Sequence, residues 1–265
     1  MIYDKFIKNC LLDASKIALD GFGKVESKIK SEGNMQVLTE TDLKIGSLLI
    51  AAIQRTYPDH NIINEETGVI DKNSEFTWTI DPIDGTSNYA SKIPMFGTML
   101  GLLQNDTPIA GGIVLPVFNE VYYAEKDCGA FCNEEKISVS KNPDLNRNFV
   151  AYLLSSHPDN PETTNEECET LKKLIPNIMS LRTSNCTAFD GSYVASGRYG
   201  LALNTRSYIW DCVPLHIVVE EAGGIFTDNL GETTDYSDCT KRYKQYFRFC
   251  TGAKGIHEQV QALIK

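Results

Sequence analysis

An apolar segment that runs directly into two aspartates is the feature that most restricts how this chain can fold. Residues 76–80 are largely apolar, and Asp81 and Asp84 follow with Pro82 between them. Pro82 fixes one backbone angle, and the dipeptide Asp84-Gly85 is typical of a tight turn. We therefore expect a strand whose end directs both carboxylates toward one point, where a hard divalent cation could bind.

The residues next to these aspartates could hold a phosphate group as well as a cation. Gly85, Thr86 and Ser87 supply free backbone N–H groups at a predicted helix start, which favours an anion. The exposed carbonyl of Ile83 adds a further oxygen ligand for a metal. An ordinary turn followed by a helix cap would explain the same residues without a ligand, so this segment alone leaves both interpretations open.

Three other acidic residues are uninformative when each is taken alone. Glu65 follows a predicted strand, Asp42 stands three residues after Thr39, and Asp211 opens a predicted apolar helix. A solvated acidic loop explains the first, and helix capping explains the other two. Only their combination with the two aspartates points to a site.

The spacing of apolar residues predicts helices that flank mostly antiparallel sheets, as in a layered αβ sandwich. The predicted helices cover residues 6–18, 39–57, 165–175, 187–196 and 211–223, and the predicted strands cover residues 76–80, 96–103, 109–115, 121–124, 149–154, 179–183 and 199–203. The stretch 143–165 is rich in Pro, Asn and acidic residues. It marks a predicted boundary between a metal- and phosphate-binding lobe, 1–142, and a substrate-selecting lobe, 143–265, within one compact unit.

Charge and cysteine content restrict the partners and the compartment. The chain carries 35 acidic against 25 basic residues and lacks the basic stripe of a nucleic-acid binder, so an anionic substrate would need bridging cations. The eight cysteines are predicted to be free thiols, and no apolar run has the length of a membrane span. The start of the chain lacks the apolar core of a signal peptide. We expect a reduced, cytoplasmic protein with no nucleic-acid or membrane partner.

Taken together and in this order, Glu65, Asp81-x-x-Asp84-Gly-Thr86 and Trp210-Asp211 resemble the inositol monophosphatase family. The segments 38–42, 128–133 and 221–224 look like family segments as well, so the resemblance covers nearly the whole chain. It implies a five-layer αβαβα sandwich, a homodimer and inhibition by lithium. The activity it implies is magnesium-dependent hydrolysis of a small phosphate monoester, with inositol 1-phosphate as the first candidate.

The resemblance also assigns two to three magnesium ions. Glu65, Asp81 and the carbonyl of Ile83 would hold the first, and Asp81, Asp84 and Asp211 the second, while a weaker third ion would share Glu65. Two cations that clamp a phosphate neutralise it and lower the pKa of a bound water. Without cations, four carboxylates facing a phosphate would repel it.

The same resemblance assigns the catalytic residues. Thr86 and Asp42 would orient and deprotonate the attacking water, with Glu65 as a further catalytic carboxylate, because a threonine hydroxyl is a poor base unless a carboxylate stands behind it. Gly85 and Thr86 would hold the phosphate through backbone N–H groups. The predicted substrate-binding residues are Ile83, Asp84, Gly85, Thr86, Asn185, Cys186, Thr187, Asn204 and Asp211.

The substrate-selecting half departs from the family pattern. Asn204 stands where inositol-specific members carry an acidic residue, and the segment Asn185-Cys-Thr187 is bulkier and more polar than usual. Arg206 could favour a second anionic group or form a surface ion pair, and Lys30 is interpreted as a surface residue. Histidinol phosphate, fructose 1,6-bisphosphate and 3'-phosphoadenosine 5'-phosphate are therefore alternative substrates. A non-catalytic regulatory or binding protein on the same fold is the alternative of another class.

Overall fold

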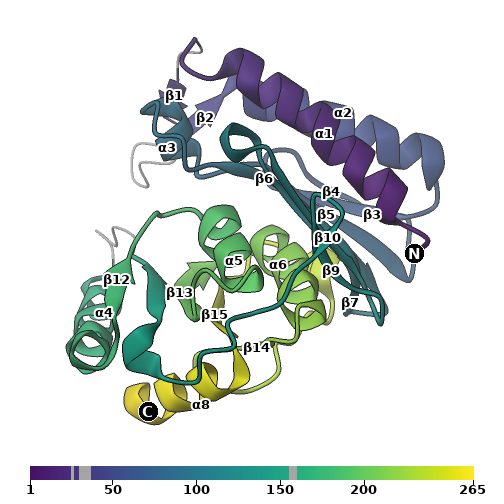
Figure 1. Cartoon of the computed structure of the whole chain (residues 1–265). Coiled ribbons are helices and arrows are strands. Elements are labelled where there is room, and N and C mark those ends of the chain that lie inside the picture. The colour runs from purple at the N-terminus through teal and green to yellow at the C-terminus, as the bar shows by residue number, and fades with distance from the viewer. Residues whose placement is uncertain (25–26, 30–36, 155–159) are drawn as a thin grey trace.

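The computed structural model describes residues 1–24, 27–29, 37–154 and 160–265, so Lys30 lies outside the described residues. The chain folds as five stacked layers of helices and sheets (Figure 1). In order, the layers are helices α1 (Asp4–Gly21) and α2 (Glu40–Thr56), an eight-stranded sheet, helices α5 (Thr187–Ala195) and α6 (Ile209–Glu221), a five-stranded sheet, and helices α4 (Pro161–Leu174) and α8 (Lys254–Ile264). The predicted αβαβα sandwich is confirmed.

The outer helices α1 and α2 form because their apolar residues recur at helical spacing. The buried face of α1 includes Ile7, Leu11 and Ala14, spaced three to four residues apart, and it packs on the large sheet. Helix α2 begins in the predicted capping box between Thr39 and Asp42 and ends at Thr56.

The eight-stranded sheet holds the strand that carries the two aspartates, β5, between β3 and β6. Its order is β10-β9-β8-β7-β6-β5-β3-β4, and all neighbouring strands are antiparallel except β3 and β5. The strands are β3 (Asn61–Asn64), β4 (Gly68–Ile70), β5 (Phe76–Asp84), β6 (Gly97–Gln104), β7 (Thr107–Leu115), β8 (Glu120–Glu125), β9 (Gly129–Cys132) and β10 (Glu135–Lys136).

The five-stranded sheet has the order β12-β11-β13-β15-β14, and β11 is parallel to both of its neighbours. Its strands are β11 (Phe149–Leu153), β12 (Ser180–Arg182), β13 (Leu201–Ser207), β14 (Ile225–Thr227) and β15 (Phe247–Gly252). The short elements are β1 (Ser27–Ile29), β2 (Val37–Thr39), α3 (Thr86–Ala90), α7 (Cys239–Arg242) and three 3-10 turns, at Pro116–Phe118, Leu145–Arg147 and Ile175–Asn177.

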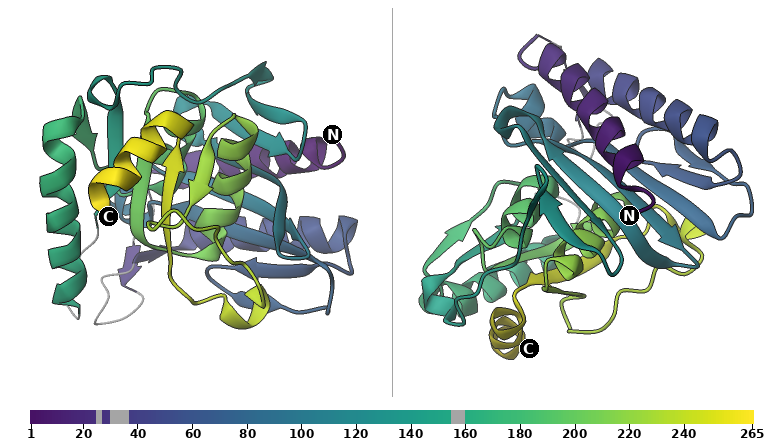
Figure 2. Two further views of the ribbon diagram at one scale, coloured as in Figure 1. Left: turned by 90° about the horizontal axis from the view of Figure 1, so that it is seen from below. Right: turned by 45° about the vertical axis from the view of Figure 1, so that its right-hand side comes forward.

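Core packing runs across the predicted lobe boundary. Helix α6 lies between the two sheets and packs against both, as two further views make clear (Figure 2). Buried residues of the large sheet such as Met99 and Ile113 belong to the same apolar cluster as Val213 and Leu215 of α6. The division at residue 142 stays a prediction.

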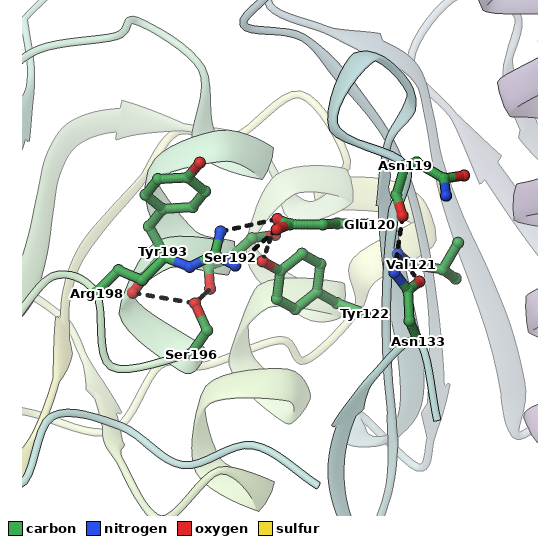
Figure 3. Close-up of polar contacts among 9 residues, drawn as sticks. All are labelled: Asn119, Glu120, Val121, Tyr122, Asn133, Ser192, Tyr193, Ser196 and Arg198. Atoms are coloured by element: carbon green, nitrogen blue, oxygen red, sulfur yellow. Dashed lines mark hydrogen bonds and ion pairs between the residues drawn. The ribbon is translucent and has the colours of Figure 1, made fainter. Parts of the chain in front are cut away.

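An ion pair also joins the large sheet to the segment that follows α5 (Figure 3). The guanidinium of Arg198 donates to both carboxylate oxygens of Glu120, at 2.9 and 2.6 Å, and lies over the ring of Tyr193. The hydroxyl of the fully buried Tyr122 donates to the same carboxylate at 2.6 Å. A two-pronged pair of this kind fixes orientation as well as distance, so it fixes α5 relative to strand β8.

Two predicted boundaries are corrected. Helix α6 begins at Ile209 rather than Asp211, because Tyr208 is the N-cap and Asp211 is the third helical residue. The strand predicted at 199–203 runs from Leu201 to Ser207. All eight cysteines are free thiols. In the described part of the chain, no helix is long and apolar enough to cross a membrane.

The aromatic cluster beside α1 and α2 gives the first testable expectation, a contribution of His60 to stability that is lost in mild acid. His60 stacks between the rings of Tyr57 and Phe76, and its Nδ1 accepts a hydrogen bond from the indole N–H of Trp78 at 3.1 Å. Burial lowers the pKa of His60 below its ordinary value of 6.5. The unfolded chain therefore binds the proton first, so the stability that His60 contributes is present above pH 6.5 and is lost as the pH falls.

Thermal unfolding at pH 7.5 and pH 5.5 tests this expectation. Relative to the wild type at the same pH, the Tm of His60→Gln should rise between pH 7.5 and pH 5.5, because only the wild type loses the contribution of His60. Gln54→Asn, at an exposed position of α2, is the control and should follow the wild type at both pH values. A Tm difference between His60→Gln and the wild type that stays the same at the two pH values would contradict the expectation.

Candidate active site

The two aspartates of β5 stand on either side of an irregularity in the strand. Asp81 pairs with Met99 and Asp84 with Gly97, and the register shifts between them. The hydroxyl of Thr98 donates to the Pro82 carbonyl at 2.7 Å and fixes the irregular segment. A bulge re-aims side chains that regular alternation would send to opposite faces, so both carboxylates reach the same site.

Gly85 makes the turn that follows. Its φ of 80° lies in the left-handed region, and a Cβ there would stand 2.9 Å from the carbonyl oxygen of Met95. The turn leads into the short helix α3, with Gly85 as its N-cap. The turn therefore follows directly on the end of β5, and the phosphate-binding role of its backbone N–H groups stays a prediction.

Asp211 comes to the same place from the other half of the chain. Its side chain accepts the backbone N–H of Tyr208 and the hydroxyl of Ser207, each at 2.9 Å. These bonds hold the carboxylate at the first turn of α6. Ligand oxygens of Asp81, Asp84 and Asp211 all lie within 4.8 Å of one another, a spacing that fits a metal ion.

Electrostatics within this group favour a bound cation. Burial raises the pKa of Asp81 well above its usual range, and the carboxylates of Glu65, Asp84 and Asp211 raise it further. Burial and Asp211 raise the pKa of Asp84 to about 7. Burial also raises the pKa of Asp211. Like charges confined in a buried site resist ionisation, and a divalent cation removes that resistance.

The hydrogen bonds of these carboxylates also favour a bound cation. Asp81 is 3% exposed, and its Oδ1 has no hydrogen-bond partner among the described residues. Buried polar atoms are normally paired, so this oxygen is a fitting ligand. Glu65 lies beside it, because its backbone N–H donates to the carbonyl of Ile80. The residues present therefore fit a hard divalent cation.

Two residues at the start of α5 form hydrogen bonds with the Asp84 carboxylate, and the sequence did not predict these contacts. The Oδ2 atom of Asp84 accepts the backbone N–H of Ala188 at 2.5 Å and the thiol of Cys186 at 3.0 Å. Cys186 is fully buried and also caps α5. The Cys186 thiol therefore points toward Asp84, a predicted metal ligand, rather than into a substrate pocket.

The predicted catalytic pair lies where helix α3 meets the start of α2. The hydroxyl of Thr86 donates to the carbonyl of Ile83 at 2.8 Å. Asp42 is fully buried and accepts the backbone N–H of Thr39 at 2.8 Å. The hydroxyl of Tyr89 in α3 reaches that of Thr41 at 3.3 Å, so the two elements are in contact. No direct bond between Thr86 and Asp42 is seen within the described residues.

The predicted substrate-selecting residues differ in exposure. Asn185 is exposed, with a left-handed φ of 56°, whereas Thr187 is 4% exposed. Asn204 is 5% exposed, and its Oδ1 accepts the backbone N–H of Arg206 at 2.9 Å. The amide oxygen of this predicted substrate-binding residue therefore already accepts one hydrogen bond from within the chain.

Two contributors to the site were missed from the sequence. Ser207 and the N–H of Ala188 orient Asp211 and Asp84, respectively. Ser207 stands four residues before Asp211, beside the helix cap, and that spacing could have identified it. Ala188 acts through its backbone, so no residue type signals its role.

Comparisons with known proteins agree with this geometry. The model of the inositol monophosphatase family matches residues 4–262. Human inositol monophosphatase 1 is 31% identical over 241 residues, which cover 86% of this chain and 86% of the relative. A fructose-1,6-bisphosphatase/inositol-1-monophosphatase of Thermotoga maritima is 31% identical over 243 residues, 92% of this chain and 88% of the relative. The solved structure of an IMPase from Thermotoga maritima superposes with a TM-score of 0.85 at 28% identity, covering 100% of this chain and 97% of that one.

Proposed function

Because the chain belongs to the inositol monophosphatase family, whose members are phosphomonoesterases, we propose that it hydrolyses a small phosphate monoester by direct transfer of the phosphate to water. The observation that supports this most strongly is the meeting of Asp81, Asp84 and Asp211 from opposite halves of the chain, next to the turn at Gly85.

Magnesium is the cofactor that we propose, with two to three ions in the site. Asp81, Asp84 and Asp211 would hold it together with Glu65 and the carbonyl of Ile83. When bound, magnesium neutralises phosphate oxygens, lowers the pKa of a bound water and stabilises the leaving alkoxide. Ser207, Cys186 and Ala188 contribute by keeping the carboxylates in place.

The chain's own groups would bind the phosphate and move the proton. The backbone N–H groups of Gly85 and Thr86 would donate to the phosphate oxygens. The Thr86 hydroxyl would turn from the Ile83 carbonyl to the attacking water and pass the proton toward Asp42. A buried carboxylate that is held by Thr39 can receive that proton without moving.

The substrate that we propose first is inositol 1-phosphate, because the human relative is named for inositol monophosphate. Fructose 1,6-bisphosphate comes second, because the Thermotoga maritima relative carries both activities in its name. Histidinol phosphate and 3'-phosphoadenosine 5'-phosphate are the two other alternative substrates that the sequence analysis named. A homodimer, lithium inhibition and a cytoplasmic location stay predictions from the sequence.

Phosphate release from these four compounds tests the proposal. We expect the purified protein with magnesium to release phosphate from at least one of them. Chelation with EDTA should abolish release, and added magnesium should restore it, because the carboxylates repel the substrate without a cation. Asp71→Asn, which changes an exposed aspartate away from the cluster, should keep the activity. If no compound is hydrolysed while magnesium still raises the Tm, the catalytic proposal is wrong and a binding role is favoured.

A further inference from the structure

A cationic and aromatic cluster lies where β13 ends and β15 begins, next to the first turn of α6. Strand β13 ends at Ser207, which pairs with Phe247 at the start of β15, so Tyr246 lies at the same end of the two strands. Tyr208 follows Ser207 and caps α6, which carries Asp211 in its first turn. We call Arg206, Tyr208 and Tyr246 the edge cluster.

The three side chains of the edge cluster are in mutual contact. The Arg206 guanidinium lies over the Tyr246 ring, with its Cζ 4.2 Å from the ring centroid, and donates to the Tyr246 hydroxyl. The rings of Tyr246 and Tyr208 have centroids 4.9 Å apart, and Tyr208 stacks on Trp210. The guanidinium is therefore held in one orientation on aromatic rings rather than left to move in solvent.

The edge cluster is joined to the metal site by direct contacts. The backbone N–H of Tyr208 and the hydroxyl of Ser207, the residue after Arg206, both donate to the Asp211 carboxylate at 2.9 Å. The Tyr208 ring in turn contacts the Tyr246 ring, over which the Arg206 guanidinium lies. Arg206 is therefore connected through its neighbours to the residues that hold a proposed metal ligand.

Arg206 keeps its charge free for a ligand, because no described carboxylate pairs with it. Four other arginines form ion pairs in the same part of the chain, namely Arg147, Arg198, Arg242 and Arg248. Glu166, which lies on nearby α4, pairs with Arg248. Arg182 also has no carboxylate partner among the described residues, but it lies over Phe149 and donates to Ser180 and to the Leu181 carbonyl. Arg206 differs in that it donates to a tyrosine hydroxyl next to the first turn of α6. Its backbone is also fixed, since Asn204 accepts its N–H at 2.9 Å.

We propose that the Arg206 guanidinium, held on Tyr246, binds a second anionic group of the substrate, a phosphate or a carboxylate on the leaving group. Guanidinium groups bind both anions through two parallel hydrogen bonds. Metal ions would bind the phosphate that is cleaved, and Arg206 would bind the second anionic group of the same substrate. Asn204 supports this arrangement, because its Oδ1 accepts the backbone N–H of Arg206. The inference rests on the proposed function and narrows its substrate class.

A matched pair of substrates tests the proposal. Fructose 1,6-bisphosphate and fructose 1-phosphate share the same scissile ester and differ only in the second phosphate. We expect Arg206→Gln to lower kcat/KM for the bisphosphate about 10- to 100-fold more than for the monophosphate, mainly through KM, as loss of a charged hydrogen bond does. Comparison of 3-phosphoglycerate with glycerol 3-phosphate shows whether a carboxylate is accepted as well.

Two further variants complete the test. Tyr246→Phe keeps the ring and removes the hydroxyl that holds the guanidinium, so it should shift the same ratio in the same direction by a smaller factor. Lys244→Gln removes an exposed positive charge nearby and should leave both substrates unchanged. The proposal is overturned if Arg206→Gln lowers kcat/KM equally for the two substrates of each pair, or lowers it for neither.

The test separates this inference from the proposed function. If none of the compounds is hydrolysed, the proposed function fails, and the two fructose phosphates are then titrated with the fluorescence of the two tryptophans as the readout. Tighter binding of the bisphosphate that Arg206→Gln abolishes still supports the anion subsite. Equal Kd values for the two compounds in the wild type overturn it.

Discussion

Asp81→Asn is expected to lower kcat/KM by about 10²- to 10³-fold and, at the same time, to stabilise the metal-free protein. Metal ions contribute several kcal/mol to transition-state stabilisation, and each loss of about 1.4 kcal/mol is tenfold in rate. Asp81 is the most enclosed member of the carboxylate group, with an unpaired Oδ1. Removing its charge removes repulsion, which should add about 0.5–2 kcal/mol to the free energy of unfolding without metal.

The pH dependence of stability gives the same prediction a second readout. The folded-state pKa of Asp84 is raised to about 7, above the value of an unfolded aspartate. The folded protein therefore holds the proton more tightly, and the metal-free protein should lose stability as the pH rises from about 4 to 7. Saturating magnesium should reverse this loss, by about 2.7 kcal/mol at a concentration 100 times the Kd.

Urea unfolding with and without magnesium measures both effects. Asp81→Asn should be more stable than the wild type with EDTA and should gain far less from magnesium. Asp71→Asn, at an exposed position away from the cluster, is the control and should behave as the wild type. A metal-free Asp81→Asn protein that is less stable than the wild type would show that like-charge repulsion does not dominate this site.

Thr86→Val is expected to lower kcat by about 10²- to 10⁴-fold with little change in KM or in stabilisation by magnesium. Valine matches threonine in shape but has no hydroxyl, so the proposed proton path from water to Asp42 is broken, and general-base catalysis is worth this factor. The backbone N–H of residue 86 remains, so phosphate binding should survive. Asp42→Asn is a poorer test, because Asp42 also caps α2.

Thr86→Ser provides the rescue for this prediction. Serine restores the hydroxyl and should recover most of the activity, while Ser87→Ala serves as the control for a neighbouring hydroxyl. Steady-state phosphate release and the magnesium-dependent shift in Tm are measured on all four proteins. Activity of Thr86→Val within about threefold of the wild type would assign activation of the water to another group.

The local parts of this molecule could be predicted from the sequence because they depend on neighbouring residues. The capping box of α2, the apolar strand before Asp81 and the turn at Gly85 each follow from residue type and spacing within a few positions. The ordered set of Glu65, Asp81, Asp84 and Asp211 also predicted the family, which the family model confirms. The start of α6 was predicted two residues late, because Tyr208 rather than Asp211 is the cap, and helix α8 was not predicted.

The tertiary structure alone decided how distant segments support the site. Ala188 and Cys186 reach Asp84 only because α5 packs beside β5, and Arg206 meets Tyr246 only because β13 pairs with β15. Such contacts join residues far apart in the sequence, and no short-range pattern encodes them. The sequence therefore determined which groups could carry the chemistry, while packing between the two sheets decided which of them are buried together.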